Sequence, residues 1–227
     1  MRQITKNGHS LIVDDNFQDA FWKYFESGGW EPYTFNIFDT FLSPEDSYLD
    51  LGAWIGPTVL YAADLCKHCY AIEPDKIAYD ALLRNIGLSQ KNNITPFNCA
   101  IFNYDGTLQL GNDLDLGNSV TRPGQSQNLF DVECFKLSTF VSRHGIDNLK
   151  FIKIDVEGCE EFIFEDFDFF ASVKPVVYLS LHEFWFTDKA AGMEKIKTIG
   201  KLYKNSYDIH LNKINLDSLY DGVVFTD

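Results

Sequence analysis

The sequence has 227 residues, enough for one well-packed domain. Its 33 acidic residues outnumber 19 Lys and Arg and give a net charge of −14, a field that repels nucleic-acid phosphates and anionic lipid headgroups. We therefore expect no nucleic-acid partner and no membrane insertion, and no run approaches the roughly 18 apolar residues of a transmembrane helix.

The five cysteines are predicted to be reduced thiols of a cytoplasmic protein, because their number is odd and their positions follow no disulfide framework. The sequence also lacks the charged start and apolar run of a secretory signal. Cys66 and Cys69 form a C-x-x-C pair, but no second pair completes a zinc site. We expect this pair to be buried at a helix–strand junction.

Residues 1–45 are predicted to form a short N-terminal cap of helix and loop, and residues 46–227 the main domain. The cap is rich in aromatic side chains that either pack on the sheet or roof a pocket, with packing favoured: Phe21, Trp22, Phe25, Trp30, Tyr33, Phe35, Phe38 and Phe41.

From Ser47 onward, short apolar runs alternate with helical patterns. The expected helices cover residues 58–66 and 75–88, and the expected strands cover residues 48–51, 68–72, 94–99, 150–155, 175–181, 207–211 and 222–226. Near-continuous apolar strands separated by helices indicate a parallel sheet covered on both faces. The sequence therefore predicts a doubly wound α/β domain with a mostly parallel seven-stranded sheet, closed by an antiparallel edge strand.

Two segments interrupt this alternation. Residues 102–110 are predicted to form a β-hairpin, because Asp105-Gly106 at their centre supplies a left-handed turn. Residues 111–127 are rich in Gly, Asn, Asp and Ser and are expected to form a loop beside the sheet.

The most informative segment is D-L-G-A-W-I-G, which begins at Asp50 between the first strand and the first helix. Its glycines let the backbone approach a ligand closely, at the strand end where open α/β sheets bind ligands. The acid suits the ammonium and sulfonium of S-adenosylmethionine, whereas the G-x-G-x-x-G fingerprint of NAD enzymes is missing. The segment therefore favours S-adenosylmethionine and supplies four further predicted contacts to it: Gly52, Ala53, Trp54 and Gly56.

A second acid, Glu73, ends the next strand and is followed by Pro74. A carboxylate there can accept hydrogen bonds from both hydroxyls of a ribose. Glu73 lies 23 residues after Asp50, the length of one strand–helix–strand unit, so the two acids are in register. Cys99 and Ala100, at the end of the third strand, either border the adenine ring or only mark the end of the strand.

The fourth predicted strand carries Lys153 and ends at Asp155, with Glu157 in the following loop. Both acids are expected on the rim that holds the cofactor, where they can orient the acceptor, touch the methionyl ammonium or remove a proton. The alternatives are a helix N-cap for Asp155 and a buried ion pair for Lys153. We favour function for Asp155 and a structural role for Lys153.

His182 follows the fifth strand and is expected beside Asp155, as a candidate general base or as a structural histidine. Asn118 and Ser119, in the polar loop, are expected to reach the cofactor or the acceptor. Asp155, Glu157 and His182 have side chains that can bind a divalent cation, but their spacing matches no metal motif, so we expect no metal.

Three strings resemble the FkbM-type methyltransferase family: Y-L-D-L-G-A-W-I-G at 48–56, A-I-E-P at 71–74 and I-K-I-D-V-E-G-C-E at 152–160. The likeness spans about residues 47–183, including Asp105-Gly106 and Asn118-Ser119. It implies a class I, Rossmann-like methyltransferase with S-adenosylmethionine as donor and S-adenosylhomocysteine as product. It also implies O-methylation of a sugar or natural-product hydroxyl, so a small-molecule or glycan acceptor is the expected partner.

The sequence departs from the family pattern at two positions. Trp54 stands where the family often has Asn, a difference expected to alter contacts near the methionyl end. His182 stands where many relatives carry an acid earlier in the strand, which leaves the base open.

Two rival interpretations remain: an NAD-dependent oxidoreductase, disfavoured by the missing fingerprint, and a non-catalytic module that binds S-adenosylmethionine. Neither the acceptor nor the oligomeric state follows from the sequence.

Overall fold

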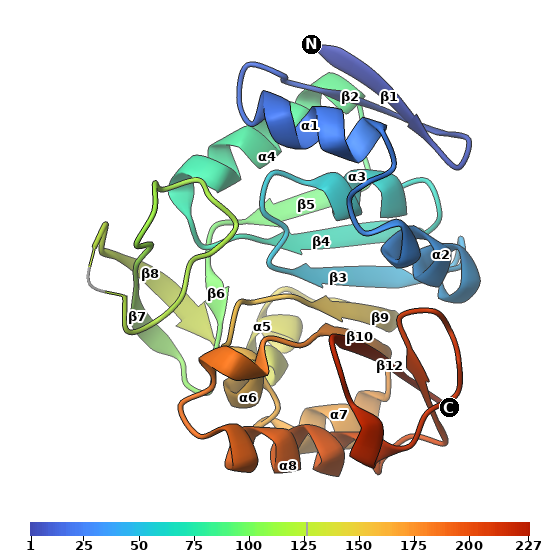
Figure 1. Ribbon diagram of the computed structural model, residues 1–227, viewed down its shortest axis with the longest axis vertical. Coiled ribbons are helices and arrows are strands. Elements are labelled where there is room, and N and C mark those ends of the chain that lie inside the picture. Colours follow the sequence, from blue (N-terminus) through green and yellow to red (C-terminus); the bar gives the residue numbers. More distant parts are fainter. Residues whose placement is uncertain (126) are drawn as a thin grey trace.

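The computed structural model describes residues 1–125 and 127–227. A seven-stranded sheet lies at the centre of the protein (Figure 1). The strand order is β11-β12-β10-β9-β3-β4-β5. In chain order the strands are β3 (Ser47–Leu51), β4 (His68–Ile72), β5 (Ile94–Phe97), β9 (Leu149–Ile154), β10 (Val176–Ser180), β11 (Asn205–Asp208) and β12 (Gly222–Thr226). The doubly wound α/β fold predicted from the sequence is confirmed.

The order of the strands reverses at the middle of the sheet. The chain runs from β3 outward to β4 and β5, then returns to the other side of β3 to form β9 and β10, with all these neighbours parallel. Open α/β sheets bind ligands at the carboxyl ends of the strands beside such a reversal. Within this sheet β12 runs antiparallel to both β10 and β11, so the reversed strand is second from the edge and β11 is outermost.

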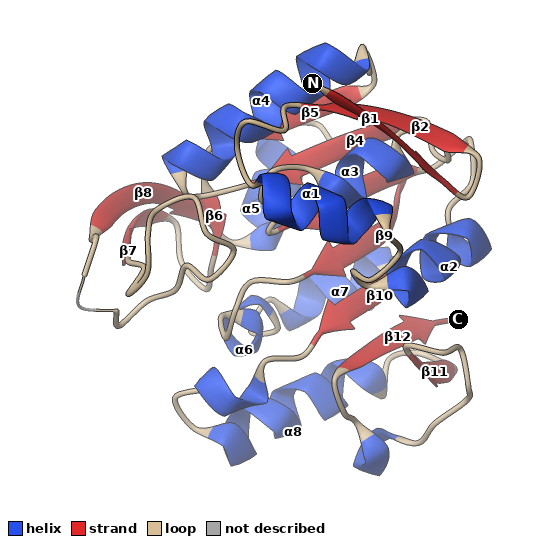
Figure 2. Cartoon of the chain, turned by 45° about the horizontal axis from the view of Figure 1, so that its top comes forward, coloured by secondary structure: helices blue, strands red, loops and turns tan. Residues whose placement is uncertain are grey.

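Helices cover both faces of the sheet (Figure 2). On one face lie α1 (Asp19–Glu26), α2 (Pro32–Phe41), α3 (Pro57–Ala62) and α4 (Lys76–Ser89), and on the other α5 (Leu137–Arg143), α6 (Glu160–Ile163), α7 (Phe167–Val173) and α8 (Lys189–Gly200). Because side chains alternate along a strand, Tyr48 enters the first core and Leu49 the second. Two 3-10 turns, η1 (Glu183–Trp185) and η2 (Leu216–Ser218), complete the helical elements of the described residues.

The N-terminal cap contains a hairpin that the sequence analysis missed. β1 (Arg2–Lys6) pairs antiparallel with β2 (His9–Val13) around Asn7 and Gly8, whose φ angles are 47° and 86°. Asn-Gly is the usual sequence of a two-residue hairpin turn, so this signal was present in the sequence. The side chains of Trp22, Phe25, Phe35 and Phe38 are fully buried in the same core as those of β3 and α3, which confirms the favoured packing role for them.

The hairpin predicted for residues 102–110 is wrong. β7 (Gly106–Leu110) instead pairs antiparallel with β8 (Phe130–Phe135), and β6 (Ala100–Ile101) pairs parallel with β8, in a separate three-stranded sheet. Asp105 is held by other partners, since its carboxylate accepts hydrogen bonds from the backbone N–H of Lys136 at 2.8 Å and the hydroxyl of Thr139 at 3.0 Å. Pairing of β7 with a distant strand and these long-range hydrogen bonds of Asp105 override the Asp-Gly turn signal.

Other boundaries differ by a few residues. The strand expected at residues 94–99 divides into β5 and β6, and the helix expected at residues 58–66 covers Pro57–Ala62. The expected start of α4 is confirmed, because the Asp75 carboxylate caps it by accepting from the backbone N–H of Ile77 and Ala78. Cys66 and Cys69 are buried free thiols. Within the described ranges, no helix is both long enough and apolar enough to cross a membrane.

Candidate functional site

Two adjoining cavities open at the carboxyl ends of β3, β4 and β9, beside the reversal of strand order. Both are bordered by Gly52, Glu73, Ser119, Asp155 and Glu157. The backbone brings the strand ends together, because the N–H of Gly52 donates to the carbonyl of Ile72 and the N–H of Asp155 to that of Leu51, each at 3.0 Å. Gly52 has a φ of 84°, which suits glycine far better than other residues.

The first cavity is mainly apolar and encloses about 520 Å³, with the open space at its mouth included. Besides the shared border it is lined by the ends of β3, β4 and β9 and by the small sheet: Leu51, Ile72, Pro74, Ala100, Ile101, Leu108, Leu110, Thr121, Val156 and Cys159. A flat aromatic base fits such a lining, since apolar side chains surround it and Glu73 stands at its edge.

The second cavity is more polar and encloses about 690 Å³, measured in the same way. The cap contributes Phe21, Trp30 and Glu31 to its wall, and the loop after β3 contributes Ala53 and Trp54. The remaining lining is formed by Pro57, Thr58, Lys153 and His182. Aromatic rings and ionisable groups therefore line the same space.

Glu73 fastens the glycine loop to the end of β4. One carboxylate oxygen accepts from the backbone N–H of Trp54 and the other from that of Asp75, both at 2.8 Å. Asn98 holds the same turn by donating to the carbonyls of Glu73 and Pro74 at 2.9 Å each. Burial raises the pKa of Glu73 to about 8 in spite of the two backbone donors. The carboxylate is rigidly placed between the two cavities.

Trp54 and Asp75 hold the polar loop against the mouth of the site. The indole of Trp54 donates to the carbonyl of Gly117 at 2.9 Å, and the Asp75 carboxylate accepts from the N–H of Gly117 at 2.6 Å. The Trp54 ring also packs edge-on against Phe21, with 4.5 Å between ring centroids. Trp54 has a left-handed backbone with a φ of 48°, a conformation in which Asn is enriched among residues other than glycine.

Asp50 lies beneath the cavities and not in their lining. It is fully buried, and its carboxylate accepts a 2.6 Å hydrogen bond from the Thr58 hydroxyl. Lys153, also buried, lies 2.7 Å from the Asp155 carboxylate and 4.0 Å from that of Asp50. Although burial acts to raise the pKa of Asp155, the charges of Lys153 and His182 lower it overall, so this carboxylate is ionised at neutral pH.

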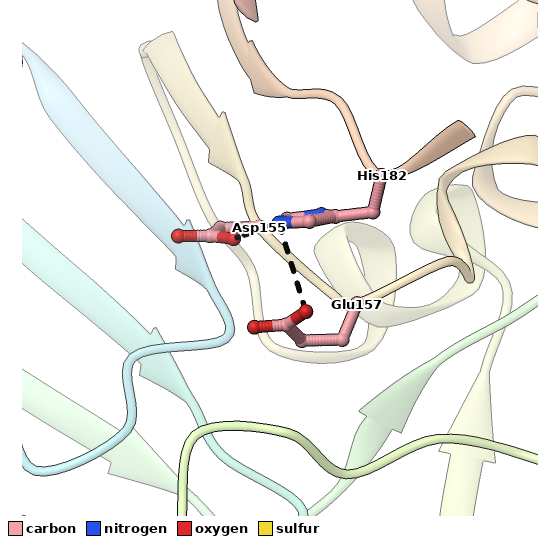
Figure 3. Close-up of side chains that lie close together, drawn as sticks. All are labelled: Asp155, Glu157 and His182. Atoms are coloured by element: carbon pink, nitrogen blue, oxygen red, sulfur yellow. Dashed lines mark ion pairs between the residues drawn. The ribbon is translucent and has the colours of Figure 1, made fainter. Parts of the chain in front are cut away.

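His182 lies among three carboxylates. Its Nδ1 is 2.7 Å from the carboxylate of Glu160, which is fully buried at the start of α6. Its Nε2 is 3.8 Å from Asp155 and 3.6 Å from Glu157, both of which reach toward the ring (Figure 3). The imidazole also stacks on Trp185, with 5.6 Å between ring centroids.

These neighbours shift the proton equilibria of the site. Burial acts to lower the pKa of His182, but the hydrogen bond that its ring donates to Glu160 and the charges of Asp155, Glu160 and Glu157 outweigh it and raise that pKa to about 9. Burial, opposed by His182, raises the pKa of Glu157 to about 7. At neutral pH His182 is therefore an imidazolium, whereas Glu157 exchanges its proton readily.

Asp155, Glu157 and His182 each present a possible metal-ligand atom, and these atoms lie within 4.8 Å of one another. The sequence analysis expected His182 beside Asp155, although strand β10 and helices α6 and α7 separate Glu157 from His182 along the chain and no metal motif relates them. The same three groups also form a set of mutually compensating charges, with Lys153 as a further cation.

Most of the residues predicted for the site border the cavities: Gly52, Ala53, Trp54, Glu73, Pro74, Ala100, Ser119, Asp155, Glu157 and His182. Four others lie outside both linings: Asp50, Gly56, Cys99 and Asn118. The sequence analysis did not single out Glu31 or Glu160. Glu160 ends the string at 152–160 that resembles the family, whereas no motif marks Glu31, which only the fold brings to the site.

Comparison with known proteins agrees with this architecture. The model of the Methyltransferase FkbM domain family matches residues 50–209, well over half of the chain. A crystal structure of methyltransferase FkbM from Methylobacillus flagellatus KT is similar with a TM-score of 0.52 and 16% identity, covering 81% of this chain and 44% of that one. The chain thus spans less than half the length of that relative. No curated protein matches the sequence.

Two further solved structures have lower TM-scores. An rRNA methylase from Streptococcus thermophilus has a TM-score of 0.48 and 10% identity, covering 84% of this chain and 90% of that one. The M. jannaschii protein TYW2 in complex with AdoMet has a TM-score of 0.44 and 16% identity, covering 98% of this chain and 82% of that one. The family match and the fold agree, and the chain belongs to the FkbM methyltransferase family.

Proposed function

We propose that this protein transfers the methyl group of S-adenosylmethionine to a hydroxyl oxygen of a small acceptor, a sugar or another natural product. The observation that carries this proposal is the second cavity, where four carboxylates, Glu31, Glu73, Asp155 and Glu157, face two cationic side chains beside the glycine loop. Such acids can accept hydrogen bonds from the ribose hydroxyls and the ammonium of this donor, and the G-x-G-x-x-G loop that binds a dinucleotide diphosphate is missing.

The residues present fit this donor along its whole length. The apolar first cavity suits an adenine, and Ala100 and Pro74 there offer small or flat surfaces. Glu73, between the cavities, is the group that would accept hydrogen bonds from ribose hydroxyls. The second cavity would hold the methionyl end, which carries an ammonium, a carboxylate and the sulfonium.

The chemistry requires a base and an aligned acceptor. When bound, S-adenosylmethionine supplies an electrophilic methyl group. This methyl group passes to the acceptor oxygen as that oxygen loses its proton, and the donor becomes S-adenosylhomocysteine. Glu157 is the base we propose, because its pKa of about 7 lies near the operating pH and its side chain borders both cavities. His182, as an imidazolium, holds Asp155 and Glu157 in place.

The cap supports a ring-shaped acceptor. Phe21 and Trp30 line the second cavity together with its ionisable groups, and aromatic faces pack well on sugar rings and apolar rings. The net charge of −14 opposes a polynucleotide acceptor. We therefore place a small hydroxylated molecule ahead of RNA, and a screen that includes RNA as one arm compares the two directly.

Calorimetric titration tests the donor first, with S-adenosylmethionine, S-adenosylhomocysteine and NAD as ligands. We expect micromolar binding of the first two and none of NAD, and a marked loss of affinity in Glu73→Ala. Glu45→Ala, at an exposed position outside the site, is the matched control.

Two results would argue against the proposal. Failure of the folded protein to bind either adenosyl ligand would overturn the proposed donor. Binding with no turnover of any acceptor, and no slow background hydrolysis, would instead favour a non-catalytic binding module.

A further inference from the structure

The cap places one carboxylate, that of Glu31, in the wall of the second cavity. Glu31 lies between α1 and α2, outside the segment 50–209 that the family model matches. Trp30 beside it and Phe21 on α1 line the same cavity. The cap therefore contributes a charged group to the site as well as aromatic rings.

A relay of buried hydroxyls fixes the Glu31 side chain. The Thr34 hydroxyl donates to one Glu31 carboxylate oxygen at 2.9 Å, and the Tyr178 hydroxyl lies 2.9 Å from the Thr34 oxygen. Thr34 and Tyr178 are almost completely buried. The Glu31 backbone is left-handed, with a φ of 35°, a costly conformation for a residue that is not glycine. The fold thus holds Glu31 firmly in a strained position.

Glu31 differs from the other acids of the cavity in its partners. Asp155 is paired with Lys153 at 2.7 Å, Glu157 lies 3.6 Å from His182, and Glu73 is bound by two backbone N–H groups. No cationic side chain of the described residues lies within 4.0 Å of Glu31. Burial, followed by the charge of Asp155, raises its pKa. A partly buried carboxylate with no cation beside it favours a cationic ligand over a neutral hydroxyl.

We propose that Glu31 binds the α-ammonium group of the methionyl moiety of S-adenosylmethionine and S-adenosylhomocysteine. This inference rests on the proposed function, because it assigns one charged group of the proposed donor to one carboxylate of the second cavity. It gives the cap a defined role in cofactor affinity. It also accounts for a strained, unpaired acid in the lining.

The test removes the carboxylate and the ammonium separately. S-adenosylhomocysteine and its deamino analogue, which lacks only the ammonium, are titrated into the wild-type protein, Glu31→Gln and the exposed control Glu45→Gln. The wild type and Glu45→Gln should prefer S-adenosylhomocysteine by at least about tenfold, as expected for one charge-assisted hydrogen bond. Glu31→Gln should lose this preference and bind the analogue with nearly wild-type affinity, which also shows that it is folded.

Other outcomes separate the inference from the function on which it rests. Equal preference for the ammonium in Glu31→Gln and the wild type would overturn the inference and leave the methyltransferase proposal intact. The same holds if Glu31→Gln weakens both ligands equally, because the carboxylate would then act on the fold and not on the ammonium. If the wild type binds neither ligand, the proposed function itself fails.

Discussion

A Cβ atom on Gly52 would lie 1.9 Å from the carbonyl oxygen of Asp155. The loop after β3 and the end of β9 therefore touch through backbone atoms at the border of both cavities. The atom that an added Cβ would meet belongs to the backbone, which cannot move aside as a flexible side chain can. The steric demand adds to that of the φ of 84°, so glycine is required here on two independent grounds.

Gly52→Ala is expected to lower the free energy of unfolding by more than about 2 kcal/mol, because the added methyl forces β3 and β9 apart. Chemical denaturation followed by circular dichroism measures this change. Gly87→Ala is the matched control, since Gly87 lies in α4 with open space around its Cβ position. That variant should gain about 0.5–1 kcal/mol from helix propensity, and equal effects of the two variants would contradict the steric explanation.

The placement of Glu73 and Asp155 at one rim of the sheet followed from the sequence, because parallel strands carry their terminal residues to one edge. Glu73 and Asp155 each follow a strand whose apolar run is legible, so their placement needed no knowledge of distant contacts. Glu31 was not predictable in the same way. No periodicity or spacing relates the cap to the end of β9, and only packing brings Glu31 to the cavity that Asp155 borders.

In the small sheet of β6, β7 and β8, a local sequence signal was present but predicted the wrong structure. Asp105-Gly106 has the composition of a tight turn, but β7 pairs with β8, whose residues begin some twenty positions later. Asn7-Gly8 has a comparable signal and does form a hairpin. The difference lies in the partners of Asp105, which are Lys136 at the start of α5 and Thr139 within that helix.

Trp54→Asn tests how the chain tolerates a tryptophan in a left-handed position. Asn relieves backbone strain, but it removes the ring contact with Phe21 and the hydrogen bond to Gly117. We expect a net destabilisation of about 1–2 kcal/mol, because these two interactions together exceed the strain. Unfolding in urea measures this change in the free energy of unfolding. Trp54→Phe, which keeps a ring and lacks the indole N–H, should lose less stability than Trp54→Asn. A stabilised Trp54→Asn would show that backbone strain dominates.

The dependence of kcat/KM on pH is expected to be bell-shaped. Activity should rise through about pH 7 as Glu157 loses its proton, and fall through about pH 9 as His182 loses the charge that holds the two acids. Glu157→Gln should reduce kcat by about 10²-fold or more, as expected for the loss of a general base. His182→Gln should retain more activity and lack the alkaline limb. A rate that keeps rising through pH 9 would instead identify His182 as the base.

Methyl transfer is expected to survive exhaustive chelation, although Asp155, Glu157 and His182 lie close enough to bind a metal ion. The reason is that positive charge is already supplied among these carboxylates. The Lys153 ammonium lies 2.7 Å from Asp155, and the His182 ring, charged below about pH 9, lies 3.6 Å from Glu157. A divalent cation would have to displace the His182 proton and compete with Lys153 for Asp155.

The measurement is turnover of the protein after treatment with EDTA and gel filtration, with and without added Mg²⁺ or Mn²⁺. Unchanged turnover in all three samples is the expected result. Loss of turnover that either metal restores would make the three side chains a metal site, and Asp155→Asn should then raise the metal concentration required. In that case the neutral imidazole of His182 would be a ligand, with Glu160 orienting its Nδ1, and the alkaline limb of the pH profile would disappear.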